Sequence, residues 1–159
     1  MKITKEWLEE EAACHEGIEW LENQKLSDGL EIVKSLMGED KTKNEWANWL
    51  IVRIMDRKQY LSYSIFAARQ VLDIFEKKYP TDNRPRLAIE AAEKCLREDS
   101  AAARAAARAA GDAAWSTAGD AARAAWASRA TAWAAGDAAQ IKMQIKILKH
   151  GIELLEAKQ

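Results

Sequence analysis

The chain has 159 residues, of which 48% are hydrophobic and 31% charged, and its formal net charge at pH 7 is −1. This length and composition are typical of one globular domain with a core of its own, so we expect a single domain over residues 1–159. A net charge near zero argues against a dedicated nucleic-acid binder, because such proteins draw their affinity from many phosphate-neutralising lysines and arginines. The apolar runs are far shorter than the roughly 20 residues that a membrane span needs, so we expect no membrane span.

Cysteine usage and the start of the chain point to the cytoplasm. Cys14 and Cys95 lie far apart without a CxxC spacing, and no charged-then-apolar leader precedes the first residues. Neither feature supports secretion, so we expect a cytoplasmic protein.

Charge is distributed unevenly along the chain. Residues 1–45 hold 6 Lys or Arg against 12 Asp or Glu, a balance of −6, whereas residues 101–159 hold 8 against 5, a balance of +3. An acidic region suits a basic protein partner, although the same charges could serve only to keep the domain soluble. The candidate partner-binding acids are Glu6, Glu9, Glu10, Glu16 and Glu19.

Short amphipathic helices are predicted at the start of the chain. Thr4 can cap a first helix, and a second follows around residues 18–21. Ser27 is the expected cap of a third helix over residues 28–37, which Gly38 ends.

Longer helices follow. Thr42 and Glu45 form a T-x-x-E capping box that predicts a helix to about Ile54. Apolar residues from Arg57 onward recur at i, i+3/i+4 and i+7, which predicts a helix that ends at Tyr79, since the residue before a proline is pushed out of the α region.

Residues 81–85 indicate the end of one helix and the start of the next. Asp82 or Asn83 offers a cap oxygen, and Pro85 suits the first turn of a helix that runs from Arg86 to about Arg97. We expect Arg84 and Arg86 to tie the start of this helix to carboxylates of neighbouring helices. Its expected buried residues are Leu87, Ile89, Ala91, Ala92 and Leu96.

The stretch from Ala101 to Gln140 holds 22 alanines and no proline. Alanine has the best helix propensity but buries little area, so this stretch is predicted to be helix that neighbours must pack against closely. GDAA occurs three times within it, and glycine followed by aspartate is typical of a helix end and a new start. We expect one turn near Gly111 or Gly119, a second near Gly136, and a last helix over residues 137–157.

These signals together predict an all-α fold, a closely packed antiparallel bundle or array of about seven to nine helices. Within it we distinguish an acidic subregion over residues 1–43 and a helical core over residues 44–159.

The sequence lacks the common motifs of phosphate-binding sites, zinc proteases and serine nucleophiles. No GxGxxG, GxxxxGK[ST], HExxH or GxSxG occurs, and the two histidines, His15 and His150, lie far apart in the chain, so we expect no enzyme, no cofactor and no metal site.

Three tryptophans form an unusual pattern. Trp115, Trp126 and Trp133 are 11 and 7 residues apart, so on one continuous helix they lie within roughly 20° of one direction. Such a face could stack on arginines and bind a partner, or it could fill the core between alanine helices. The arginines near that face are Arg104, Arg108 and Arg129.

The segment VLDIFEKKYPTDNRPRLAIEAA over residues 71–92 resembles the FExxxPxDxRPRxAIEAA segment of a family of immunity proteins found beside bacterial polymorphic toxins and in phage genomes. The repeated AARAA and GDAA elements resemble the carboxy-terminal helices of that family, so the resemblance covers about residues 44–139. It implies an all-helical domain that protects a cell by binding a toxin, and it implies no catalytic residue.

Two functions from different classes follow. The first is a non-enzymatic, immunity-type or phage-encoded counter-defence inhibitor that binds a toxin, nuclease or defence effector and uses the acidic helices as a decoy for a basic cleft. The second is a nucleic-acid-associated protein that contacts phosphates with its basic carboxy-terminal region. A homodimer is left open. The basic residues in question are Arg104, Arg108, Arg123, Arg129, Lys142, Lys146 and Lys149.

Overall fold

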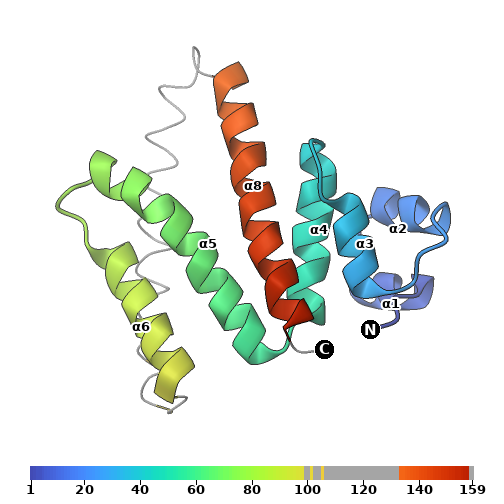
Figure 1. Cartoon of the computed structure of the whole chain (residues 1–159), viewed down its shortest axis with the longest axis horizontal. Helices are drawn as coiled ribbons and strands as arrows, with labels where there is room; N and C mark the ends of the chain where they lie inside the picture. Colours follow the sequence, from blue (N-terminus) through green and yellow to red (C-terminus); the bar gives the residue numbers. More distant parts are fainter. Residues whose placement is uncertain (99–100, 102–104, 106–132, 158–159) are drawn as a thin grey trace. The chain divides into compact units, whose positions relative to one another are not determined.

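The computed structural model describes residues 1–98, 101, 105 and 133–157 (Figure 1). In this part of the chain every regular element is a helix, so the predicted all-α fold class is confirmed. The helices there are α1 (Lys5–Glu10), α2 (His15–Glu22), α3 (Gly29–Leu36), α4 (Lys41–Ile54), α5 (Arg57–Lys78), α6 (Arg84–Glu98) and α8 (Trp133–Glu156).

By its contacts the chain divides into two compact units. Unit 1 comprises Met1–Asp56 with Gln140–Gln159, and unit 2 comprises Arg57–Ala139. The expected single domain over residues 1–159, with its acidic subregion, stays a prediction.

Unit 1 is built around the pair of helices α3 and α4. Apolar residues recur at helical spacing along both, and their burial contributes about 1.5–3 kcal/mol for each large aliphatic side chain. Leu148 and Ile152 of α8 are buried in the same unit, and Lys34 Nζ of α3 lies 2.5 Å from Glu156 Oε1 of α8. The buried residues of α3 and α4 are Ile32, Val33, Leu36, Ala47, Leu50 and Ile51.

Two aspartates cap the helices of this pair, and the predicted caps at Ser27 and Thr42 are wrong. Asp28 Oδ1 accepts from the first turn of α3, and Asp40 Oδ1 accepts from the Thr42 backbone N–H at 2.9 Å. The Ile3 N–H donates to the Ser27 carbonyl at 2.7 Å. A carboxylate also interacts favourably with the positive end of the helix dipole, which a neutral hydroxyl does less.

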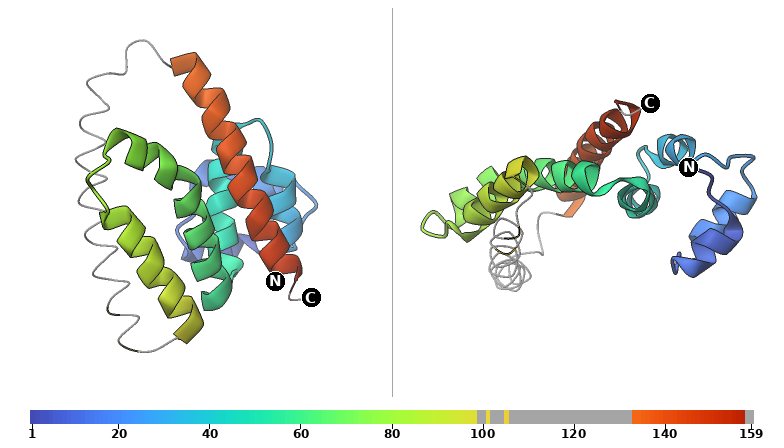
Figure 2. Two further views of the ribbon diagram at one scale, coloured as in Figure 1. Left: turned by 60° about the vertical axis from the view of Figure 1, so that its left-hand side comes forward. Right: turned by 90° about the horizontal axis from the view of Figure 1, so that it is seen from below.

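Unit 2 contains α5 and α6, which lie side by side in Figures 1 and 2. Its described core comprises Ile65, Leu72 and Ile89. The predicted burial of Leu87 is wrong, since it is 49% exposed. Residue 87 lies about 200° around the helix from residue 89, so both cannot face α5; Cys95 is buried instead.

The helix α8 begins at Trp133 and continues through Gly136 and Asp137, so the predicted turn near Gly136 is wrong. A glycine inside a helix costs about 1 kcal/mol relative to alanine, and the alanines on both sides of Gly136 favour the continuous helix. The predicted turn near Gly111 or Gly119 lies outside the described residues.

Candidate protein-binding surface

The helices α1 and α2 present the acidic candidates to solvent. Glu6, Glu9, Glu10, Glu16 and Glu19 are all exposed. Among their neighbours, Glu22 pairs with Lys5 at 2.7 Å and Glu11 with Arg53 at 3.2 Å.

Within the described residues, no cation forms an ion pair with Glu9, Glu10, Glu16 or Glu19. Their charge is therefore not neutralised by an ion pair there, and it contributes to the field outside α1 and α2.

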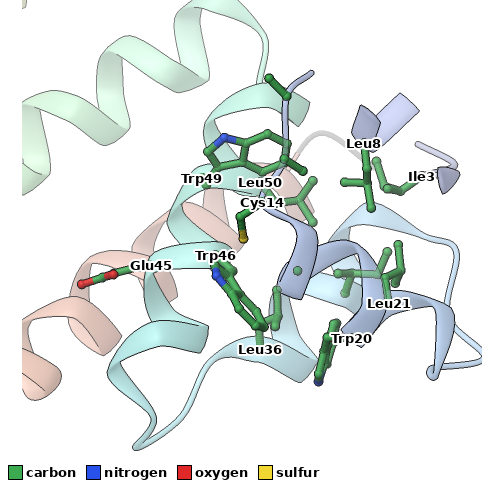
Figure 3. A pocket seen from close by; sticks show the side chains of 14 residues that line it. Ile3, Leu8, Cys14, Trp20, Leu21, Leu36, Glu45, Trp46, Trp49 and Leu50 are labelled. Carbon is green, nitrogen blue, oxygen red and sulfur yellow. The ribbon is translucent and has the colours of Figure 1, made fainter. Parts of the chain in front are cut away.

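A pocket of about 330 Å³ lies between these two helices and the pair α3 and α4 (Figure 3). We call it the tryptophan pocket, because three indole rings line it together with aliphatic side chains. Glu45 is its one charged lining residue, and Figure 3 shows that carboxylate directed away from the other side chains. The lining residues are Ile3, Leu8, Ala12, Ala13, Cys14, Gly17, Trp20, Leu21, Ile32, Leu36, Glu45, Trp46, Trp49 and Leu50.

The wall formed by α2 approaches α4 closely at Gly17. A Cβ atom at this position would lie 3.3 Å from Cys14 Sγ and 3.8 Å from Trp46 Cδ2. The missing side chain at residue 17 therefore leaves room for the thiol and the indole in the pocket wall.

The turn between α1 and α2 forms another part of the wall. The Ala13 N–H donates to Leu8 O at 2.9 Å and the Ala12 N–H donates to Glu9 O at 3.1 Å, which is the Schellman pattern of a helix end. Ala12 has φ 56°, in the left-handed region that usually requires glycine. The helix end thus holds an alanine in a strained conformation at the pocket.

Trp49 is fixed by contacts from two helices. Its ring meets the Trp7 ring edge to face, with centroids 6.2 Å apart and planes at 68°. The Arg53 guanidinium carbon lies 3.9 Å from the Trp49 ring centroid, and Arg53 Nε donates to Glu11 Oε2 at 3.2 Å. Stacking on the ring and pairing with the carboxylate hold the arginine in place, so the indole is oriented before any partner arrives.

Local sequence patterns indicate only part of this pocket. Trp46, Trp49 and Arg53 follow one another at i+3 and i+4 along one helix face, which was a signal for a cluster. The facing wall comes from residues about 30 positions away, and no local pattern predicts that approach.

The motif Arg84-Pro85-Arg86 lies at the start of α6. Arg86 donates to Glu76 of α5 through Nε at 2.8 Å and Nη2 at 2.6 Å, so it ties the two helices together. Arg84 pairs with Asp82 in the preceding loop, and the Asp82 carboxylate also accepts the Arg84 backbone N–H at 3.1 Å. The Arg84 side chain, more than the backbone contact, holds the pKa of Asp82 below its ordinary value.

Basic residues form a stripe on α8. Lys142, Lys146 and Lys149 are exposed and follow one another at i+4 and i+3, so they share one helix face. The side chain of Trp133 lies outside the described part of the structure, as do Trp115 and Trp126. The other basic candidates also lie outside it; they are Arg104, Arg108, Arg123 and Arg129.

No helix in the described part of the chain is long and apolar enough to cross a membrane, and no group of three or more His, Cys, Asp or Glu there is placed to hold a metal ion.

Comparison with known proteins identifies a family. The model of the family described as Imm-5 like putative immunity protein matches residues 50–154. No curated protein and no solved structure is significantly similar to the chain. The match contains α5, α6 and most of α8, whereas the acidic helices and all but one lining residue of the tryptophan pocket precede it.

Proposed function

The chain belongs to the Imm-5 like immunity protein family, and from this premise we propose that it protects a bacterial cell by binding a protein toxin without catalysing a reaction. The family membership carries this proposal. It is supported by the absence of nucleophile, phosphate-binding and metal-binding motifs from the sequence.

The binding surface in this proposal is the exposed acidic face of α1 and α2. Toxins that act on nucleic acids hold their substrate in basic clefts, and carboxylates placed over such a cleft compete with phosphates for the same cations. Charges on the rim of an interface mainly raise the association rate, because they steer the partner before contact. A phage-encoded protein that inhibits a host defence effector would use the same surface chemistry.

Co-expression with the toxin encoded by a neighbouring gene tests the function. We expect the wild-type chain to restore growth to cells that produce the toxin. We expect the triple variant Glu9→Lys, Glu10→Lys and Glu16→Lys to fold but to protect poorly.

A matched triple variant reverses three exposed charges elsewhere in unit 1 and should protect like the wild type. Its substitutions are Glu31→Lys, Glu39→Lys and Glu153→Lys. No protection by the wild-type chain at equal expression would refute the proposed function.

A second candidate function rests on the lysine stripe of α8. Three exposed cations on one helix face can contact phosphates, as in a nucleic-acid-associated protein. A salt series distinguishes the two functions, because binding to DNA through three phosphate contacts would follow a slope of about −2.7 in log affinity against log salt.

A further inference from the structure

The tryptophan pocket is large for the interior of a small unit. Protein interiors contain few voids larger than a water molecule, and an apolar cavity of about 150 Å³ already binds benzene. The tryptophan pocket has about 330 Å³. Trp20, Trp46 and Trp49 in its lining are half-buried, and Ala12 and Cys14 at the turn are exposed, so the pocket opens to solvent.

We propose that this pocket receives one aromatic side chain from a basic segment of the protein partner. The inference rests on the proposed function and names what the partner inserts. An open apolar pocket walled by indoles offers an aromatic ring both burial and edge-to-face contacts, and such anchors dominate many protein interfaces.

The charges around the pocket decide what flanks that ring. The turn that forms one wall is preceded by Glu10 and Glu11 and followed by Glu16, and Glu45 lies on the opposite wall with its carboxylate directed outward (Figure 3). Arg53 is held by Glu11 and Trp49, so it does not offset the remaining carboxylates. A segment with lysines or arginines beside the aromatic residue is complementary to this rim, and an acidic segment is repelled.

The pocket is also prepared for an occupant. Trp49 is held by Trp7 and Arg53, and Gly17 leaves room for Cys14 Sγ in the pocket wall. A wall that is already ordered loses little conformational freedom when a side chain enters, which favours tight binding.

Three indole derivatives test the pocket on the whole chain without a partner. Tryptamine carries a positive charge, indole is neutral and indole-3-acetate is negative. The series therefore separates the contribution of the aromatic ring to binding from the contribution of the charge. We expect tryptamine to shift the indole N–H signals of Trp20, Trp46 and Trp49 in ¹⁵N-labelled protein. At low salt it should bind about tenfold more tightly than indole-3-acetate, and this ratio should fall toward one as salt screens the rim.

Matched variants test whether the probes bind in the tryptophan pocket and whether the charges around it select among them. Ala13→Phe should fill the pocket and abolish these shifts, whereas Ala157→Phe at an exposed position should not. Reversing Glu16 and Glu45 to lysine should remove the preference for tryptamine, and reversing Glu31 and Glu39 should preserve it.

Several outcomes would overturn the inference. If tryptamine shifts none of the three signals, the pocket does not take an aromatic ring. If the three probes bind equally at low salt, it is a site for a small neutral molecule and no basic segment is selected.

Toxin protection separates this inference from the proposed function. If folded Ala13→Phe protects cells as well as the wild type while reversal of Glu9, Glu10 and Glu16 abolishes protection, the pocket is not the anchor site although the function stands. If the wild type itself gives no protection, the proposed function fails whatever the probes show.

Discussion

The side-chain amide of Asn44 pairs with both backbone groups of Gly38. Its Oδ1 accepts the Gly38 N–H at 3.0 Å, and its Nδ2 donates to the Gly38 carbonyl at 2.7 Å. Asn44 is only 1% exposed and Gly38 is half-buried, so these bonds lie at the border of the interior of unit 1. They join the start of α4 to the end of α3, and they thereby fix the helix that carries Trp46 and Trp49.

Replacing Asn44 should destabilise unit 1 strongly. Asn44→Ala removes both hydrogen bonds, each of which contributes about 0.5–1.5 kcal/mol, and water can replace part of them because Gly38 is half-buried. We expect a loss of about 1–3 kcal/mol in the free energy of unfolding, measured by urea titration. Ser35→Ala at an exposed position of α3 is the control, and an equal small effect of both substitutions would contradict the role of this amide.

The helix caps give a second prediction. Asp40→Ala removes the acceptor for the Thr42 and Lys43 N–H groups and should cost about 1 kcal/mol. Thr42→Ala should change the stability by less than about 0.5 kcal/mol, because Thr42 lies inside the helix and an exposed substitution there has little effect. A larger loss in Thr42→Ala than in Asp40→Ala would restore the T-x-x-E capping box predicted from the sequence.

The strained turn gives a third prediction. Ala12→Gly removes the cost of a left-handed alanine, and the greater freedom of glycine in the unfolded chain offsets part of the gain. We expect a net stabilisation of about 0.5–1 kcal/mol, seen as a higher melting temperature. Ala13→Gly, at the neighbouring position, should not stabilise the chain, and a higher melting temperature in that variant alone would argue against strain at residue 12.

The boundaries of α5 and α6 were predictable from the sequence, whereas the caps of α3 and α4 were not. Tyr79-Pro80 and Pro85 restrict the backbone whatever surrounds them, so a local pattern suffices. Whether Ser27 or Asp28 caps α3, and whether Asp40 or Thr42 caps α4, depends on the other hydrogen bonds that these residues make.

The tryptophan pocket was still harder to predict. Glu11 and Arg53 are 42 positions apart, and only packing of the unit brings them together at Trp49.

Asp28 makes the stability of unit 1 depend on pH. The Glu31 backbone N–H is the main cause that holds the pKa of Asp28 below its ordinary value, with smaller contributions from the chain's amino terminus and the Leu30 N–H. A lowered pKa means that the charged form is favoured in the folded state. Its stabilisation is complete above the unfolded pKa of about 3.9 and is lost as the pH falls through the folded pKa.

The isosteric variant Asp28→Asn isolates this charge. It retains a capping oxygen but cannot ionise, so the wild type should be the more stable protein at about pH 6 and should lose that advantage as the pH falls below the unfolded pKa of about 3.9. Urea titrations of both proteins across this range measure the difference. A difference that stays constant with pH would show that the carboxylate does not contribute through its charge.

The most direct test of the central claim is the rate at which the purified chain associates with the toxin encoded by a neighbouring gene. At low salt, changing Glu9, Glu10 and Glu16 to lysine should slow association by at least about tenfold, and the difference should shrink at physiological ionic strength, where the Debye length is about 8 Å. The folded variant with Glu31, Glu39 and Glu153 changed to lysine should associate near the wild-type rate. If the first variant is folded and associates as fast as the wild type at low salt, the acidic face of α1 and α2 is not the binding surface.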